Sequence, residues 1–429
     1  MANTKPMAKA IAISSLLSAM GIAVPYNAMA ADTLEGALKE STAKLNLRPR
    51  YENVEATTAD GVESRSEAAT LKTRLTFSTG SFYDFSAVLE FDDVTALRDV
   101  DYLDGTNGKD GPAIVDPEGT EVNEAYLAYK GLADTTFKWG RQRIVLDNQR
   151  FVGGVAWRQN EQTYDSFSVL NSSVPGLTAF YANISNVNRI VGEQVLAGDA
   201  TQETNLLNVG YQFEGIGKLT AYYYDIDNQD DIFFGASNTT MGVRFAGSSS
   251  LDALKLDYEL EWADQEETGD NPVEYSADYT LISLMGTMSG FSLGIAQEVL
   301  GGDTDATVIA TGATTAKGFT TSLATAHKFQ GWADVFLNTP GTGIEDMYVT
   351  FKAGLPMGMS FMAVYHDFES SESVAEDKSS DFGSEIDAVL SKKFDNGATL
   401  MLKYADFSAG DDYYTTDVKK VWVMATYAI

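Results

Sequence analysis

The sequence ends in Val421-Trp422-Val423-Met424-Ala425-Thr426-Tyr427-Ala428-Ile429, a stretch in which apolar residues continue to the last position. Tyr427 and Ile429 fall on one face of an extended strand, because side chains along a strand point alternately to its two faces. A terminal strand of this kind is typical of outer-membrane barrels, whose last strand pairs with the first because an open sheet edge cannot lie in lipid. A soluble β-domain can also end on an apolar strand, so other parts of the sequence have to distinguish a membrane barrel from a soluble domain.

The chain begins with the features of a secretory signal peptide. Lys5 and Lys9 provide a short basic region, 10–24 is an apolar run, and Ala28-Met29-Ala30 supplies the small residues of a cleavage site. We therefore predict a Sec signal peptide at 1–30, with the remainder, 31–429, as the mature protein. The apolar run is shorter than the ~20 residues of a transmembrane helix, and no later stretch is long and apolar enough to be one.

The composition fits a secreted barrel and excludes one class of partner. The chain has no cysteine, whereas compact secreted domains often depend on disulfides and a barrel closed by its own hydrogen bonds does not. The formal net charge is −31 at pH 7, and a chain this acidic repels the phosphates of nucleic acids. We expect the acidic residues mainly in external loops and in the lumen, where they favour solubility or attract divalent cations. Neither a nucleic-acid partner nor a cofactor is expected.

Strict alternation of apolar and polar residues over about ten positions recurs along the chain. In 254–262, Leu254, Leu256, Tyr258, Leu260 and Trp262 oppose Lys255, Asp257, Glu259 and Glu261. The same alternation marks 44–52, 71–78, 83–92 and 399–404. An unbroken apolar face has to be buried in an apolar phase, while the charged opposite face excludes the core of a sandwich. Lipid outside and water inside account for both faces, so we predict an all-β, transmembrane, antiparallel up-and-down barrel.

The predicted number of strands depends on one segment, 301–345. Connections alternate between short turns and long polar loops, and an even number of strands follows if both chain ends lie in the periplasm. If 319–328 and 331–337 are strands, the barrel has 20 strands; if 301–345 is one loop, it has 18. We predict 18, because this segment contains Pro340 and several glycines and its apolar alternation is poor.

The most distinctive stretch is 137–165, which is rich in arginine. It contains the runs Gly140-Arg141-Gln142, Asp147-Asn148-Gln149-Arg150-Phe151 and Trp157-Arg158-Gln159-Asn160-Glu161-Gln162. These runs resemble the alginate-export porin family, and Glu124-Ala125-Tyr126-Leu127, Gly331-Trp332-Ala333-Asp334 and Thr339-Pro340 fit the same pattern. The resemblance covers most of the mature chain and implies an 18-stranded barrel. For the family's namesakes it implies an arginine-lined lumen that passes an anionic polysaccharide, although the motifs indicate the family and not the solute.

The residues by themselves indicate a divided lumen. On the early strands, a set of basic side chains could form a basic wall of the lumen, and alternation assigns those of the first two strands to the inward face. The set is Arg48, Arg50, Lys72, Arg74, Arg141 and Arg143. The side of Arg141 is open, because Phe137 and Trp139 share its face. Asp257, Glu259 and Glu261 form an acidic face on the eleventh strand, nearly opposite in a ring of 18. We expect Asp84 and Glu90 to pair with the basic wall.

Two interpretations of this charge pattern are open. A basic wall that faces an acidic wall suits small polar or zwitterionic solutes, whereas an exporter of a uniform polyanion should be basic all round its constriction. Alternatively, the inward Arg and Glu residues only neutralise each other in ladders that stiffen the barrel.

Metal and catalytic sites have weak support in the sequence. Asp99, Asp101, Asp104, Asn107 and Asp110 could offer oxygen ligands to Ca²⁺, but their spacing departs from the EF-hand and lacks its closing Glu, so we expect a hydrated loop and no metal.

The only histidines are His327 and His366, and a hydrolase would need a Ser or Asp partner across the barrel mouth. We predict no catalytic residue. An outer-membrane hydrolase and an adhesin or structural barrel are the alternative functions.

The segment 301–345 is longer than a simple connection between two strands, and it mixes aromatic residues with few charges. We therefore expect it to fold into the lumen. His327, Lys328, Trp332 and Asp334 would then lie at the constriction. The sequence as a whole predicts a porin, a passive water-filled channel for polar or anionic solutes, with an acidic oligo- or polysaccharide as the specific candidate. Expected partners are membrane lipid, lipopolysaccharide, the barrel assembly machinery and the solute. The expected pore-lining residues are Arg48, Arg50, Arg74, Arg141, Arg143, Arg150, Arg158, Asp257, Glu259 and Glu261.

Overall fold

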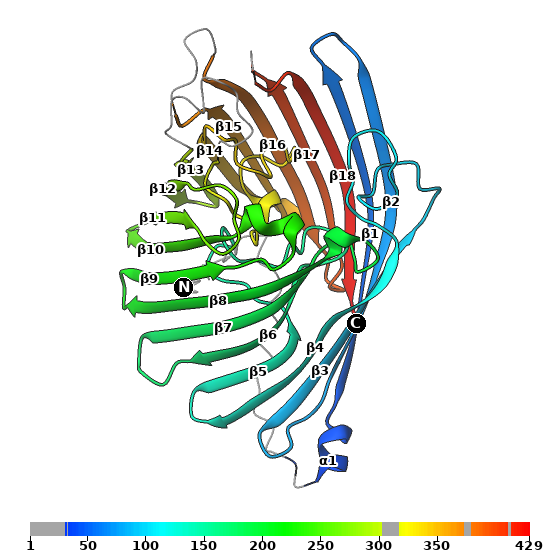
Figure 1. Cartoon of the computed structure of the whole chain (residues 1–429), viewed down its shortest axis with the longest axis vertical. Coiled ribbons are helices and arrows are strands. Elements are labelled where there is room, and N and C mark those ends of the chain that lie inside the picture. The colour runs from blue at the N-terminus through cyan, green and yellow to red at the C-terminus, as the bar shows by residue number, and fades with distance from the viewer. Residues whose placement is uncertain (1–30, 32, 303–316, 373–378, 411–412) are drawn as a thin grey trace, which may run out of the picture.

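The computed structural model describes residues 31, 33–302, 317–372, 379–410 and 413–429. In these ranges the chain forms one 18-stranded antiparallel sheet that closes on itself as a barrel (Figure 1). The strands are β1 (Thr42–Thr58), β2 (Glu63–Ser78), β3 (Phe85–Ala96), β4 (Gly119–Leu132), β5 (Thr135–Gln142), β6 (Thr163–Asn171), β7 (Leu177–Asn188), β8 (Asp199–Phe213), β9 (Gly217–Ile226), β10 (Asn238–Leu251), β11 (Leu254–Glu267), β12 (Ser276–Met288), β13 (Phe291–Leu300), β14 (Ile344–Leu355), β15 (Met359–Glu369), β16 (Asp381–Lys393), β17 (Thr399–Ala409) and β18 (Thr416–Ala428).

The barrel closes between the first and the last strand, as the C-terminal sequence predicts. β1 pairs with β18 from Asn46↔Ala428 to Thr58↔Thr416 and with β2 along its other edge (Figure 1). The remaining strands pair in chain order, so each strand of the sheet has a partner on both sides. The predicted 18-stranded up-and-down barrel is confirmed.

The alternative of 20 strands is wrong. Within 319–328 and 331–337 the only strand-like contact is an isolated bridge between Leu323 and Val152. β13 instead pairs directly with β14, from Phe291↔Ala353 to Leu300↔Ile344. The glycines and the proline of this segment do not sustain a ladder of hydrogen bonds, so the connection leaves the wall.

The two faces of the wall differ in the way that the alternation predicts. Large apolar side chains on the outer face are uncovered, as for Trp139 (72% exposed) and Leu293 (63%). Such exposure is costly in water and favourable in lipid. The inward positions of β1 and β2 are polar and covered, among them Arg48, Arg50 and Lys72.

The two rims of the barrel carry different connections. At the rim that holds the start of β1 and the end of β18, strands are joined by tight turns such as Ser289-Gly290, whose positive φ angles of 54° and 85° fit a two-residue hairpin turn. The short helix α1 (Leu34–Lys39) precedes β1 here, and Oγ1 of Thr33 caps it by accepting from the N–H of Gly36 (3.0 Å). The opposite rim, called the distal rim below, carries the long loops.

Helical structure in the described ranges is limited to short segments. Besides α1 there are 3₁₀ turns at η1 (Leu196–Gly198), η2 (Asp231–Ala236), η3 (Ala326–Lys328) and η4 (Pro356–Gly358). No helix in these ranges is long and apolar enough to cross a membrane. Residues 1–30, for which the sequence predicts a signal peptide, and residues 303–316 of the predicted lumen segment lie outside the described residues.

Candidate functional site

Two connections from the distal rim meet inside the barrel. We call them inner loop 1 (143–162, between β5 and β6) and inner loop 2 (317–343, the described part of the connection between β13 and β14). The N–H of Gly153 donates to the carbonyl of Leu323 (2.8 Å), and Thr325 bonds Gln149 through its backbone N–H (3.1 Å) and its hydroxyl (2.8 Å). A Cβ on Gly153 would lie 2.2 Å from Oγ1 of Thr325, so only glycine allows the loops to approach this closely.

Arg48 and Arg50 on β1 attach inner loop 1 to the wall. Nε of Arg48 donates to the side chain of Gln159 (2.9 Å), and its Nη1 donates to the carbonyl of Ala156 (2.8 Å). Nη1 of Arg50 donates to the carbonyl of Trp157 (2.7 Å). Arg48 therefore donates to the loop, and Arg50 donates both to the loop and to Glu52 of β1; both residues are buried.

Glu52 and Asp334 neutralise the cations where the two loops join the wall. Glu52 on β1 accepts from Arg50 (2.6 Å) and Arg158 (3.2 Å), and Asp334 in inner loop 2 accepts from Arg158 (3.2 Å) and Lys420 of β18 (2.7 Å). Burial alone would raise the pKa of Asp334, but the positive charges around it hold that pKa well below its usual value. Ion pairs thus join both inner loops to the seam between β1 and β18.

His327 links Asp334 of its own loop to Lys403 on β17. Nδ1 of the ring lies 2.5 Å from Oδ1 of Asp334, and Nε2 lies 2.6 Å from Nζ of Lys403. A carboxylate only accepts and an ammonium only donates, so Nδ1 carries the ring proton and Nε2 is the acceptor. Burial lowers the pKa of His327 to about 3, although Asp334 opposes this shift, so the ring is neutral at pH 7.

Three indole rings enclose Lys403. Its Nζ lies 4.0 Å from the ring centre of Trp157, 3.8 Å from that of Trp332 and 5.1 Å from that of Trp422. His327 stacks on Trp157 with the ring centres 4.5 Å apart. These rings come from inner loop 1, inner loop 2 and β18, so one ammonium on β17 joins four parts of the chain through cation–π contacts. The alternation in 399–404 places Lys403 inward, but no signal in the sequence indicates that these tryptophans meet there.

Carboxylates neutralise much of the predicted basic wall. Arg74 lies 2.6 Å from Asp92 and 2.7 Å from Glu161, while Arg143 lies 2.5 Å from Glu161 and 2.9 Å from Glu90. Burial alone would raise the pKa of Glu161, but its neighbouring cations, led by Arg143, hold that pKa well below its usual value. The expected pairing of Glu90 with this wall is present. Glu161, which sequence reasoning quoted only as part of a motif, is the centre of the cluster.

The acidic residues of β11 lie across the ring from β1 and β2, since the strands follow each other in chain order. Glu259 pairs with Arg244 of β10 (2.8 Å) and accepts from the amide of Asn148 in inner loop 1 (2.9 Å). Glu261 lies 3.6 Å from Arg244, and Asp257, towards the rim of the termini, lies 2.5 Å from Lys255. The acidic wall is therefore partly neutralised as well.

Arg150 and Lys328 lie between the inner loops and the wall. Nε of Arg150 is 2.9 Å from Glu298 of β13, and Gln330 joins the pair by accepting from Arg150 (2.9 Å) and donating to Glu298 (2.5 Å). Nζ of Lys328 donates to the backbone carbonyl of Asn148 (2.7 Å). Both cations contribute to the contact of inner loop 2 with its surroundings.

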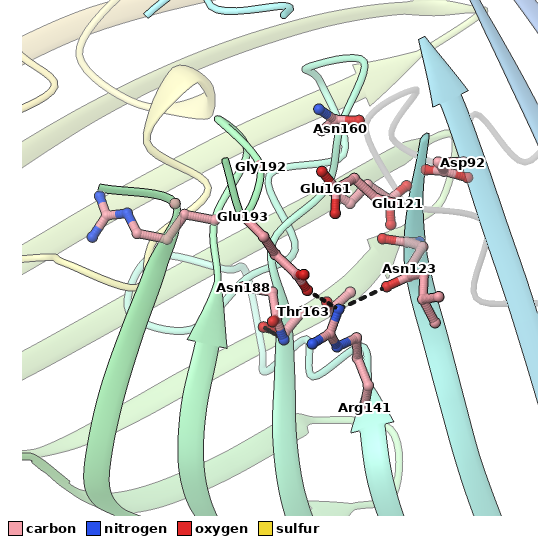
Figure 2. A pocket seen from close by; sticks show the side chains of 13 residues that line it. Asp92, Glu121, Asn123, Arg141, Asn160, Glu161, Thr163, Asn188, Gly192 and Glu193 are labelled. Atoms are coloured by element: carbon pink, nitrogen blue, oxygen red, sulfur yellow. Dashed lines mark hydrogen bonds and ion pairs between the residues drawn. The ribbon is translucent and has the colours of Figure 1, made fainter. Parts of the chain in front are cut away.

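Arg141 starts from the outer face of β5, but its guanidinium borders a small pocket together with Asp92 and Glu161, the partners of Arg74 (Figure 2). It shares the outer face of β5 with Trp139, and the pairing of β4 with β5 ends at Ala125↔Arg141 because β5 then leaves the wall. Figure 2 shows its guanidinium at this break, where it donates to the carbonyl of Val122 (3.1 Å) and to Glu193 (2.8 Å). Arg141 therefore satisfies a backbone carbonyl at the point where the ladder is interrupted.

The structure also gives the positions of Asp84, of His366 and of the Asp-rich loop. Asp84 does not pair with the basic wall, because it lies exposed in the turn between β2 and β3 with a φ of 65°. His366 contacts Asp346 on the neighbouring β14 (2.9 Å), and the adjacent Asp367 points to the other face of the strand. In the Asp-rich loop, Asp104 caps the backbone of Thr106 (2.7 Å), and the described residues hold no cluster of three or more metal-ligating side chains.

A cavity of about 330 Å³ lies beside inner loop 2. Inner loop 2 borders it with Lys328, Phe329 and Trp332, inner loop 1 borders it with Asn148 and Trp157, and the inward faces of β11 to β17 form its other walls. The lumen is therefore divided between a side filled by the inner loops and β1–β2 and an open side along β12 to β17.

Comparison with known proteins places this geometry in context. Residues 40–286 match the family described as alginate export. The fold is similar to that of the outer membrane protein OpdK of Pseudomonas aeruginosa (14% identity, TM-score 0.66, 92% of this chain and 100% of that chain covered) and to OpdK with vanillate (13%, 0.68, 92% and 100%). It is also similar to OccK9 (OpdG) of the same organism (14%, 0.68, 92% and 100%). A search of curated proteins found no match.

Proposed function

The chain belongs to the alginate export family, and from this premise we propose that its outer-membrane porin channel serves small polar or anionic solutes by passive diffusion. Barrels of 16 to 18 strands leave water inside, whereas 8 strands fill their interior with side chains. An acidic oligo- or polysaccharide is the alternative solute, because the family is described by alginate export. We further propose secretion through the Sec pathway and a Gram-negative outer membrane as the destination.

We favour small solutes over a polysaccharide because the charges around the inner loops are paired. A polyuronate carries a carboxylate on each sugar, so its path should offer a row of cations without acidic partners. Here Arg48 and Arg50 bind inner loop 1, and Arg74 and Arg143 are engaged by carboxylates. This supports a channel that passes small solutes one at a time.

We propose two roles for the predicted pore residues. Four side chains are partly exposed, and we assign them contact with the permeating solute. Their exposed fractions are 15% for Arg74, 21% for Arg143, 25% for Glu259 and 39% for Asp257. The other side chains are at most 8% exposed, and we assign them to holding the inner loops at the constriction: Arg48, Arg50, Arg150, Arg158, Glu261, His327, Trp332 and Asp334. Lys328 belongs to the same constriction.

We propose transport without catalysis. The series Asp334, His327 and Lys403 has the order of a relay towards a nucleophile, but Lys403 is 2% exposed and enclosed by indole rings. We propose that the partners of the protein are the lipid and lipopolysaccharide around the barrel, the assembly machinery that inserts the barrel, and the solute, with no nucleic acid.

Reconstitution into planar bilayers tests the proposed function. We expect stepwise conductance, and in liposome swelling we expect faster entry of monomeric uronates and neutral sugars than of uronate oligomers. Preferential entry of the oligomers would favour the polysaccharide alternative. A silent bilayer together with hydrolase activity would support an enzyme instead.

A further inference from the structure

The open side of the lumen is more apolar than the interior of a porin normally is. Inward positions of β12, β15, β16 and β17 on this side carry Leu281, Met285, Met362, Val364, Val389 and Met401. Phe329 and Trp332 of inner loop 2 face them across the cavity of about 330 Å³. This volume is in the range of small-molecule sites, and an apolar body the size of a ring gains more from such walls than water does.

The carboxylates that border this cavity already have positively charged or imidazole partners. Each lies within 2.9 Å of one, in the pairs Glu259–Arg244, Glu298–Arg150 and Asp346–His366. An anion that enters the cavity therefore does not meet an unmatched carboxylate among these three.

Two lysines on the same cavity, Lys328 and Lys352, have no carboxylate within ion-pair distance among the described residues, and the acid whose charge acts on Lys352 is Asp257. Nζ of Lys328 bonds a backbone carbonyl, that of Asn148 (2.7 Å), and Lys352 of β14 makes no hydrogen bond or ion pair with any residue in the described ranges. Both lysines line the same cavity. Burial lowers the pKa of Lys328, the charges of Arg244 and Lys352 add to this shift, and those of Glu259 and Glu298 oppose it. A carboxylate placed in that space would be attracted by both.

We propose that this cavity is a binding subsite for a small organic anion with an apolar body the size of a ring, such as an aromatic monocarboxylate. The carboxylate lies towards Lys328 and Lys352, and the ring lies against Met362, Met401 and Phe329. A sugar acid fits this site less well, because its hydroxyl groups would face methionine and valine without hydrogen-bond partners. The inference rests on the proposed porin function and names a class of solute for it.

Benzoate is the probe, and glucuronate is the matched anion with the same charge and a hydrophilic body. The protein is reconstituted into planar bilayers, and the single-channel current is recorded while each anion is titrated. We expect benzoate to reduce the current with saturation, at concentrations at which glucuronate has no effect.

Variants locate the binding. Lys352→Gln is expected to raise the half-blocking benzoate concentration about tenfold, as for the loss of one hydrogen bond to a charged group. Met362→Gln is expected to weaken the block as well, because it makes the apolar wall polar. The control is Lys39→Gln, which removes a lysine of α1 that is 74% exposed and pairs with Glu35 of the same helix, and it should leave the block unchanged.

The outcomes separate this inference from the proposed function. Normal conductance with equal effects of benzoate and glucuronate, or an unchanged block in Lys352→Gln, overturns the subsite and leaves the porin intact. A silent bilayer contradicts the proposed function, and tryptophan fluorescence of the folded protein in detergent then tests the cavity directly. Saturable quenching by benzoate that is weakened in Lys352→Gln supports the subsite, and an absence of quenching overturns it.

Discussion

Nζ of Lys403 on β17 lies 2.6 Å from Nε2 of His327 in inner loop 2, inside a ring of three tryptophans. The contact requires the imidazole to be an acceptor, so inner loop 2 is held to the wall by the neutral form of His327. Asp334, Arg158 and Lys420 surround the same junction from both loops and from β18.

Acid should therefore loosen inner loop 2. The pKa of His327 is about 3 in the docked loop and 6.5 ordinarily, so a released loop binds more protons between these values. The docked state loses about 1.4 kcal/mol for each pH unit below 6.5. We expect single-channel conductance to rise as the pH falls from 7 towards 4, and His327→Gln to remove much of this dependence. An identical pH profile in the variant would show that another group is responsible.

Replacing Arg74 should change ion selectivity. Arg74→Gln leaves Asp92 and Glu161 with one cation fewer, so the fixed charge of the lumen becomes more negative. We expect the reversal potential under a salt gradient to shift towards cation selectivity. Arg98→Gln is the matched control, because Arg98 is an exposed residue that follows β3 at the distal rim and pairs with Glu67, so it should leave the potential unchanged. Equal shifts in both variants would contradict the assignment of Arg74 to the lumen.

A single methyl group should separate the inner loops. Gly153→Ala places a Cβ 2.2 Å from Oγ1 of Thr325, and overpacking of this kind typically costs about 1–3 kcal/mol. We expect higher or less steady conductance in a barrel that still folds. Gly154→Ala is the control, since its Cβ would lie 3.4 Å from its nearest neighbour in Arg143. The proposed constriction would be contradicted if both variants conducted like the native protein.

Removing inner loop 2 should leave the wall intact. Leu300 and Ile344 are paired at the ends of β13 and β14, so a short glycine-rich linker in place of 303–340 keeps these strands adjacent. We expect a barrel that remains heat-modifiable on gels and conducts more than the native protein. Loss of assembly would indicate that the segment is needed for the wall to form.

Much of the wall could be predicted from alternation alone. The predicted inward direction of Arg48, Arg50 and Lys72 was correct, because side chains along a strand alternate between its two faces whatever the rest of the fold. The predicted inward direction of Asp257, Glu259 and Glu261 was correct for the same reason. The side of Arg141 was open from the sequence, since Phe137 and Trp139 share its face, and Arg141 lies where β5 leaves the wall. Asp84 does not pair with the basic wall because it belongs to a turn. Both residues lie where regular alternation ends.

The sequence by itself determined the class of fold and the closure of the last strand on the first, and it favoured 18 strands over 20. These follow from local patterns, because lipid requires an apolar outer face and a sheet without open edges. Only the tertiary structure decided how the inner loops meet and which charges they leave unpaired. Arg150 and Gln330 are 180 residues apart, and Lys403 reaches His327 from 76 residues away. Such contacts depend on the closed ring bringing distant segments to one axis, and no periodicity in the chain encodes which side chains then become partners.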